Sequence, residues 1–282
     1  MPIVAVVFDF DDTLMPDSTT ALLTSFDIDV EEFWRTRAPA LVSKGYDPPM
    51  AYLRLILELV GDGKPLGRLS NKDLAKFGAT LDDRYFSGIP DVFDDLNALV
   101  KDVRDVSVEF YIVSSGIQDL IKGSAIVQNY FSGVYACQLD DEDEGYVQHV
   151  KRCVTFTEKT RFLFEINKGI EQEDSESKPG LVNEDIPEKD RRVPFSNMIY
   201  AGDGLTDIPC FSLVQKNGGT AFGIFDPSNE ASAKKAFQDF LQAGRVASSH
   251  AARFKAVDEL GSLLRVAVSS KAANIAVRRG TA

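Results

Sequence analysis

Short apolar runs recur along the chain and alternate with amphipathic segments. The runs are Ile3–Phe8, Phe110–Val113, Val134–Cys137, Met198–Ala201 and Thr220–Phe225. Between most of them lie segments with helical spacing of apolar residues, for example Ile89–Val103 and Lys159–Ile170. Strands that alternate with helices are typical of a parallel sheet with helices on its faces. The sequence therefore predicts an α/β core.

The region after the first apolar run has a helical pattern and no alternation of strands and helices. Four segments there favour helices: Thr20–Phe26, Val30–Val42, Pro49–Val60 and Leu69–Leu81. The stretch from Leu53 to Val60 keeps the spacing of one buried helix face, and Ser70 with Asp73 resembles a capping box. No strand pattern interrupts this region. We therefore expect residues 16–87 to form an inserted helical module, with the core formed by residues 1–15 and 88–282.

Three further segments carry predictions. Gly145 follows five acidic residues, Asp140, Asp141, Glu142, Asp143 and Glu144, and predicts a hairpin between Val134–Leu139 and Tyr146–Val150 with a solvated tip. Calcium binding there is the weaker interpretation, because the spacing of an EF-hand loop is missing. Residues 171–192 are expected to be a mobile surface insertion. Residues 229–282 are expected to hold at least one helix, with one apolar side formed by Ala233, Ala236, Phe237, Phe240 and Leu241.

Composition narrows the class of partner. The 282 residues are 44% hydrophobic and 26% charged, with a net charge of -12, which argues against nucleic acid and anionic membranes. No run approaches a membrane span, and no basic region precedes the first apolar run as in a signal peptide, so we expect a cytoplasmic protein with a small-molecule partner. Three cysteines, distant in sequence, disfavour a disulfide framework and a zinc site. The sequence predicts no oligomeric state.

Two carboxylates follow the first apolar run directly. Residues two apart on an extended segment share a face, so Asp9 and Asp11 could not both stay ionised and unpaired in a desolvated cleft. Mg²⁺ is the natural partner, because it prefers hard oxygen ligands and often binds phosphate as well. One aspartate so placed can attack phosphorus, while the second handles the proton of the leaving group.

Polar residues also follow two other predicted strands. Ser114, Ser115 and Gly116 come after Phe110–Val113, where a hydroxyl and free backbone N–H groups can hold an anion. Asp203 and Asp207, in the segment Gly202–Asp207, follow Met198–Ala201 and supply further oxygen ligands for a metal ion.

A lysine is needed as well, because one divalent ion cannot balance the phosphoryl oxygens and these carboxylates. We prefer Lys159, which opens a predicted helix, to Lys168, which ends that helix and would complement its dipole.

These motifs resemble those of the haloacid dehalogenase (HAD) superfamily of hydrolases. Asp9-Phe10-Asp11-Asp12-Thr13-Leu14 matches its first motif, Ser114 its second, Lys159 its third and Gly202-Asp203-Gly204-Leu205-Thr206-Asp207 its fourth, in the right order. The resemblance implies a Rossmann-like parallel sheet flanked by helices, with residues 16–87 as a helical cap domain of the C1 type.

The resemblance also implies roles for these residues. Asp9 would attack phosphorus to form an aspartyl-phosphate, and Asp11 would protonate the leaving oxygen and then activate water. Lys159 and Ser114, with Thr13, Ser115 and Gly116, would hold the phosphoryl group. Mg²⁺ would be bound by Asp9, the backbone carbonyl of Asp11 and Asp203, with Asp207 nearby.

The same resemblance limits the reaction. Dehalogenases of this superfamily lack the second carboxylate, so Asp11 favours a phosphatase acting on a small phosphorylated metabolite. The glycine pair around Asp203, the cap and the hairpin are similar to phosphoserine phosphatases. The substrate itself is left open, and the cap residues proposed as pocket lining are Asp17, Arg35, Arg37 and Arg54.

Two functions are alternatives to a phosphatase. A two-component receiver domain uses similar groups, but its phosphoacceptor lies on a middle strand and its length is about half of this chain. A catalytically quiet relative that binds a phosphorylated ligand or a protein is the more serious alternative.

Overall fold

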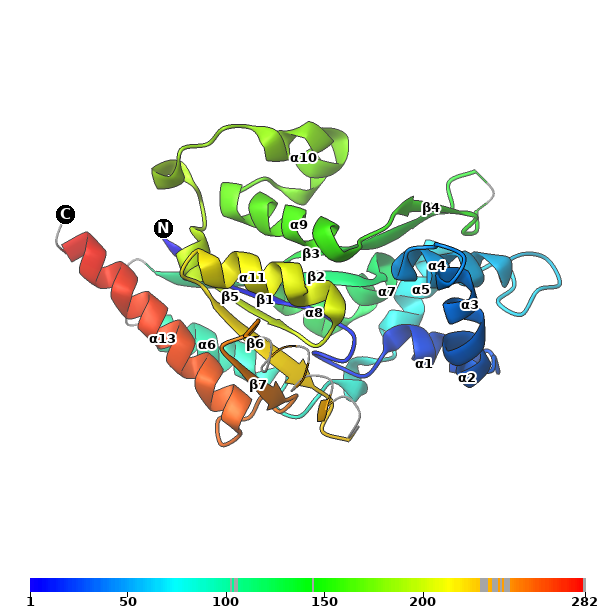
Figure 1. Ribbon diagram of the computed structural model, residues 1–282, viewed down its shortest axis with the longest axis horizontal. Helices are drawn as coiled ribbons and strands as arrows, with labels where there is room; N and C mark the ends of the chain where they lie inside the picture. Colours follow the sequence, from blue (N-terminus) through cyan, green and yellow to red (C-terminus); the bar gives the residue numbers. More distant parts are fainter. Residues whose placement is uncertain are drawn as a thin grey trace.

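A sheet of seven strands forms the centre of the molecule (Figure 1). The computed structural model describes residues 1–101, 103, 106–143, 145–228, 233–234, 238, 240 and 244–280. The strand order is β4-β3-β2-β1-β5-β6-β7, and all neighbours are parallel except β3 and β4. The strands are β1 (Ile3–Phe8), β2 (Ser107–Ile117), β3 (Phe131–Asp140), β4 (His149–Arg152), β5 (Met198–Gly202), β6 (Thr220–Phe225) and β7 (Ser248–Ala251). The five predicted strands are confirmed, and with them the α/β class.

Strand β1 lies in the middle of the sheet because both of its faces are apolar. All of its residues are buried, as expected of a strand covered by helices on both sides. Phe8 pairs with Ile112 of β2 on one side and with Ala201 of β5 on the other. The next strand in the sequence, β2, thus lies on one side of β1, and the later strand β5 lies on its other side. Such a reversal of strand order creates a crevice at the carboxyl ends of the strands, where open α/β sheets bind ligands.

Helices cover both faces of the sheet (Figure 1). Helices α9 (Phe156–Lys168) and α11 (Ile208–Lys216) pack together on one face, and α6 (Asp91–Lys101) and α13 (Glu259–Gly280) pack together on the other. Helix α13 buries a single stripe that consists of Leu260, Leu264, Val268, Ala272 and Ile275. Among the described residues, no helix is both long enough and apolar enough to cross a membrane.

Further helices of the described residues outside the region 16–87, together with η2 within it, are short. They are α7 (Gln118–Gly123), α8 (Ala125–Tyr130), α10 (Gln172–Ser177) and the 3₁₀ segments η2 (Asp82–Arg84), η3 (Pro179–Asn183), η4 (Glu188–Asp190), η5 (Phe195–Asn197) and η6 (Leu205–Asp207).

The region between β1 and α6 is helical, as predicted. It contains α1 (Ser18–Ser25), α2 (Val30–Glu32), the π-helix η1 (Phe33–Arg37), α3 (Ala38–Val42), α4 (Pro48–Glu58) and α5 (Asn71–Gly78). The capping box of Ser70 and Asp73 is confirmed at the start of α5. Helices α1–α5 gather at the end of the sheet towards which β1 runs (right in Figure 1). The division into a core and a cap domain stays a prediction.

The hairpin differs from its prediction in two respects. Its second strand is His149–Arg152 and begins late, because Val147 is buried and its N–H donates to the carbonyl of Leu69 at 2.8 Å. The acidic tip is not wholly solvated, since Asp141 accepts the N–H of Asn71 at 2.8 Å. The tip thereby stabilises the start of α5, where a carboxylate complements the helix dipole.

The segment 171–192 was predicted as a mobile surface insertion, but it holds short helices that are anchored to α9. Ser175 Oγ donates to Glu165 Oε1 at 2.7 Å, and Lys168 Nζ donates to the carbonyl of Val182 at 2.7 Å.

The C-terminal region contains one confirmed helix, α13, and one strand that the sequence did not predict, β7. The predicted apolar residues Ala236, Phe237 and Leu241, like Glu144 of the acidic run, lie outside the described residues. The three cysteines are free.

Candidate functional site

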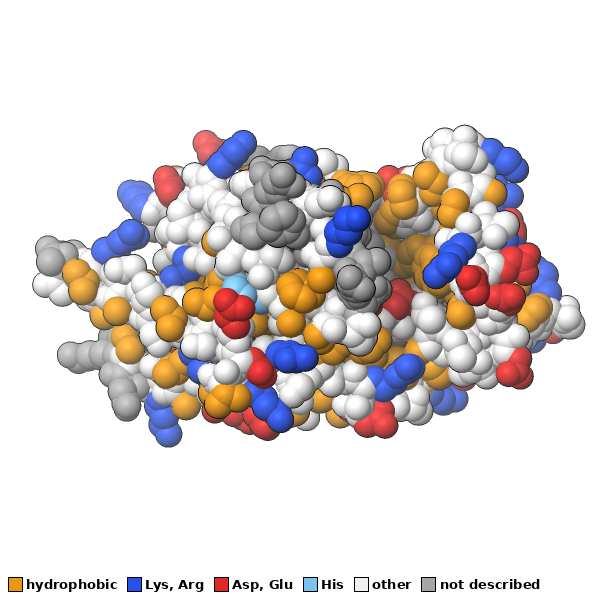
Figure 2. Space-filling view, turned by 60° about the horizontal axis from the view of Figure 1, so that its bottom comes forward, with side chains coloured by type: hydrophobic (Ala, Val, Ile, Leu, Met, Phe, Trp, Pro, Cys, Tyr) orange, Lys and Arg blue, Asp and Glu red, His pale blue; other side chains and the backbone are white. Residues whose placement is uncertain are grey.

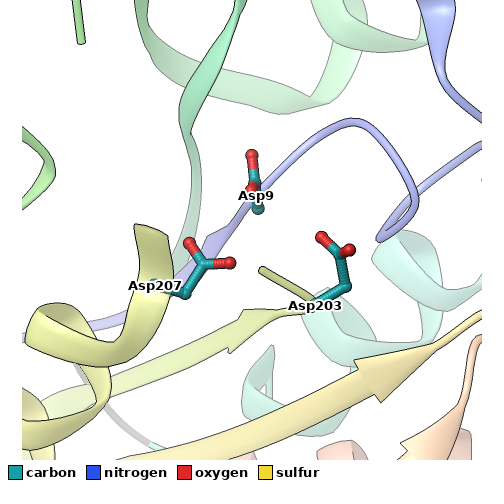
Figure 3. Close-up of side chains that lie close together, drawn as sticks. All are labelled: Asp9, Asp203 and Asp207. Atoms are coloured by element: carbon teal, nitrogen blue, oxygen red, sulfur yellow. The ribbon is translucent and has the colours of Figure 1, made fainter. Parts of the chain in front are cut away.

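Three carboxylates converge at the carboxyl ends of β1 and β5. Oxygen atoms of Asp9, Asp203 and Asp207 all lie within 4.8 Å of one another, and Figure 3 shows the three side chains next to one another. Asp9 is held in place by the pairing of its N–H with the carbonyl of Ala201 at 2.9 Å. The two halves of the polypeptide are thus joined at the crevice that the strand order creates.

Lys159 neutralises part of this cluster. Its Nζ, which is fully buried, lies 2.6 Å from Asp9 Oδ2 and 2.7 Å from Asp207 Oδ1. Burial by itself lowers the pKa of Lys159, but Asp207 and Asp9 outweigh that effect and raise it, so the lysine stays charged. Lys168 lies elsewhere and donates to backbone carbonyls, among them that of Glu184 at 2.6 Å. The preferred lysine is therefore the one beside the carboxylates.

Asp207 is tied into the protein through both oxygens. Oδ1 accepts hydrogen bonds from Lys159 and from the hydroxyl of Tyr200 at 2.7 Å, and Oδ2 accepts the N–H of Gly204 at 2.9 Å. A Cβ on Gly202 would lie 2.5 Å from Asp207 Cγ, so only glycine permits this close approach. Asp207 thereby positions Lys159 and the loop that carries Asp203.

Asp11 lines the same cavity as Asp9 but has other hydrogen-bond partners. Asp11 Oδ1 accepts the N–H of Ser18 at 2.7 Å, and Asp11 is absent from the three-carboxylate cluster. Strand β1 ends at Phe8, and both carboxylates line the same cavity, so the shared face predicted for Asp9 and Asp11 stays a prediction. Burial, then the neighbouring Asp17, raise the pKa of Asp11 well above its usual range.

The segment Ser114–Gly116, at the carboxyl end of β2 where its register with β3 shifts, lies directly beside Asp11. A Cβ on Gly116 would lie 2.5 Å from Asp11 Oδ2, and the N–H of Gly116 donates to Ser114 Oγ at 3.0 Å. Ser115 Oγ is buried and has no hydrogen-bond partner. Thr13 differs from its prediction as a substrate-binding residue: it is fully buried and donates to Asp203 Oδ1 at 3.3 Å, so it supports a carboxylate instead of lining the cavity.

A cavity of about 440 Å³ joins these groups to the helical insertion. Its lining includes Asp9, Asp11 and Asp203. Figure 2 shows a hollow with hydrophobic side chains around it. The lining also includes Ser114, Ser115, Gly116, Asp12, Asp17, Thr19, Trp34, Pro48, Tyr52, Phe156, Gly204, Leu205 and Thr206. A second cavity, of about 480 Å³, is lined by Tyr111, Tyr135 and Arg192 and contains none of the predicted site residues.

The sequence identified only part of this lining. Asp17 lies in the cavity as expected, but Arg35, Arg37 and Arg54 do not. These arginines pair on the surface, Arg35 with Glu31 at 3.1 Å and the other two with Glu58. Trp34 and Tyr52 were missed, because aromatic residues on a helix are more often part of the core.

The donor set fits a divalent cation. Burial raises the pKa of Asp9 to about 6 and that of Asp203 well above its usual range, with the neighbouring carboxylates adding to the effect for both. Three crowded carboxylates with one lysine leave net negative charge in a desolvated place. Hard oxygen ligands of this kind suit Mg²⁺.

Comparisons with known proteins agree with this architecture. No family model matches the chain. An uncharacterised protein of Borreliella burgdorferi is 32% identical over 263 residues, which cover 84% of this chain and 88% of that protein. The fold is similar to a HAD family hydrolase from Salmonella enterica serovar Typhi, at 14% identity and a TM-score of 0.53 over 80% of this chain and 65% of that one. It is also similar to a probable phosphoserine phosphatase from Vibrio cholerae, at 14% identity and a TM-score of 0.53 over 99% of this chain and 67% of that one.

Proposed function

We propose that this chain, which belongs to one family with the Borreliella protein and has the fold of the HAD hydrolases, is a metal-dependent phosphatase of small-molecule phosphate monoesters. One observation carries the proposal. Asp9 touches Lys159 at 2.6 Å beside Asp203, while Asp11 lines the same cavity but stands outside their cluster. A nucleophile and a separate proton donor are what the hydrolysis of an alkyl phosphate needs.

The reaction has two steps. A carboxylate oxygen of Asp9 attacks phosphorus, the ester P–O bond breaks, and Asp11 gives its proton to the leaving oxygen. The raised pKa of Asp11 supports a protonated carboxyl group near neutral pH. Asp11 then takes a proton from water, whose oxygen attacks phosphorus and breaks the bond to Asp9.

The phosphoryl oxygens are held by groups of this chain. Lys159 supplies a fixed positive charge, and the segment Ser114–Gly116 supplies a hydroxyl and backbone N–H groups. Asp9, Asp203 and the backbone carbonyl of Asp11 would hold Mg²⁺, which when bound offsets negative charge on the phosphoryl group. Asp207, whose oxygens already accept three hydrogen bonds, holds Lys159 in place.

Hydrolysis of para-nitrophenyl phosphate tests this proposal. We expect turnover with Mg²⁺ that EDTA abolishes and that Asp9→Asn removes, whereas the exposed control Asp83→Asn keeps it. A folded, metal-loaded protein with no turnover on a broad panel of phosphate esters would instead favour the alternative function, a catalytically quiet protein that binds a phosphorylated ligand or a protein partner. Dehalogenation is the poorer candidate, because a leaving halide needs no proton from Asp11.

A further inference from the structure

The part of the cavity that the helical insertion contributes is aromatic. Trp34 and Tyr52 lie with their ring centroids 5.6 Å apart, and Phe156 lines the same cavity from the start of α9. Their polar atoms already have partners in the protein: Trp34 Nε1 donates to Thr20 Oγ1 at 2.8 Å, and the hydroxyl of Tyr52 donates to the carbonyl of Ser115 at 2.5 Å. These bonds fix the orientation of the two rings, and both side chains line the cavity, where they are available to a ligand.

The charges of the cavity are all negative. Its lining includes five carboxylates, Asp9, Asp11, Asp12, Asp17 and Asp203, and no lysine, arginine or histidine within the described part of the chain. Asp9 and Asp203 belong to the phosphoryl end with Lys159. Asp17 belongs to the helical insertion, where it caps α1 by accepting the N–H of Thr20. In the described ranges it forms no ion pair.

Asp17 is also poorly solvated. Its side chain is only partly exposed, and no cationic side chain of the described residues pairs with it. A cation placed beside it would gain both from this charge and from the faces of neighbouring rings. A leaving group with a carboxylate would meet the opposite situation, because no basic side chain of the described lining could pair with it.

We propose that the alcohol released by this enzyme carries a positively charged amino or quaternary ammonium group, bound against Trp34 and Tyr52 with Asp17 as its counter-ion. This assignment rests on the proposed phosphatase function. It names the substrate class of the same site and separates it from phosphorylated amino acids, whose carboxylate needs a basic partner.

The test compares substrates that differ in charge but not in shape. Phosphocholine and its neutral carbon isostere, 3,3-dimethylbutyl phosphate, are hydrolysed under identical conditions with Mg²⁺, together with phosphoethanolamine and phosphoserine. We expect kcat/KM for phosphocholine to exceed that for the isostere about tenfold, as a desolvated cation–π contact and one counter-ion allow. Phosphoserine should be poorer than the isostere.

Variants locate the preference. Asp17→Asn keeps an oxygen that can cap α1, and it should reduce the ratio of phosphocholine to isostere to about one. Because Asp17 also raises the pKa of Asp11, the rates for both esters are expected to change together, and the ratio is the readout. Trp34→Leu should lower the ratio as well. Asp29→Asn is the matched control: Asp29 caps α2 by accepting the N–H of Glu32 at 2.9 Å and does not line the cavity, so the ratio should stay as in the wild type.

The results separate the two proposals. Equal kcat/KM for phosphocholine and the isostere, or a preference for phosphoserine, would overturn the cationic leaving group while leaving the phosphatase intact. Loss of turnover on every ester, para-nitrophenyl phosphate included, would overturn the phosphatase. In that case calorimetric titration of Asp9→Asn with phosphocholine and with the isostere still decides the question of the cation, since equal affinities would refute it.

Discussion

Replacing Lys159 by methionine tests how the carboxylate cluster is stabilised. The buried ammonium lies 2.6 Å from Asp9 and 2.7 Å from Asp207, two side chains that are themselves buried. At an effective dielectric constant of about 20, each contact corresponds to about 6 kcal/mol of attraction before desolvation is subtracted. Removing one partner of a buried ion pair has a net cost of about 3–5 kcal/mol, because a charge is left without compensation.

Urea denaturation in EDTA near neutral pH measures this cost as a lower free energy of unfolding. The deficit should shrink as the pH falls, because the orphaned carboxylates of the folded variant take up protons that the unfolded chain does not yet bind. Lys168→Met is the control: Lys168 donates to carbonyl oxygens at 2.6 and 2.7 Å, and its loss should cost no more than about 2 kcal/mol. Equal losses for both variants, or less than about 1 kcal/mol for Lys159→Met, would refute the reasoning.

Three further predictions concern the site. Asp11→Asn should slow the first step, the release of the leaving group in a single turnover, about 10²–10⁴-fold for alkyl phosphates but far less for para-nitrophenyl phosphate, whose leaving group needs no proton; an equal loss in this step for both would contradict the role of proton donor. Gly116→Ala puts a Cβ 2.5 Å from Asp11 Oδ2 and should lower kcat/KM, whereas Gly180→Ala, with open space around it, should not. Mg²⁺ should raise the unfolding temperature more near pH 7.5 than near pH 5, because below about 6, the raised pKa of Asp9, the ion must displace a proton; equal shifts would count against a site at Asp9.

The core could be predicted because its signals are local. The run Ile3–Phe8 is apolar throughout, as a strand buried on both faces requires, and the acidic or small polar residues that follow three such runs mark the crevice. The capping box at Ser70 was equally readable. Strand β7 was not, because Ser248–Ala251 is short and mostly polar and is fixed by its pairing with β6.

The cavity wall could not be predicted because it depends on how separate helices meet. Nothing in the sequence around Trp34 or Tyr52 states that their rings face Ser115 and Asp17 across the crevice. The arginines were chosen for their charge, but glutamates at helical spacing keep Arg35 and Arg54 on the surface. The direction of the Asp11 side chain likewise follows from the turn after β1 and from the N–H of Ser18.

Acid quenching during turnover, followed by mass spectrometry of the peptide that contains Asp9, tests the central claim most directly. A phosphoryl group attached to Asp9 in the wild-type protein, and lost in Asp9→Asn, is the predicted result. Phosphorylation of another residue such as Asp203, or steady hydrolysis during which Asp9 never carries the phosphoryl group, would contradict the mechanism.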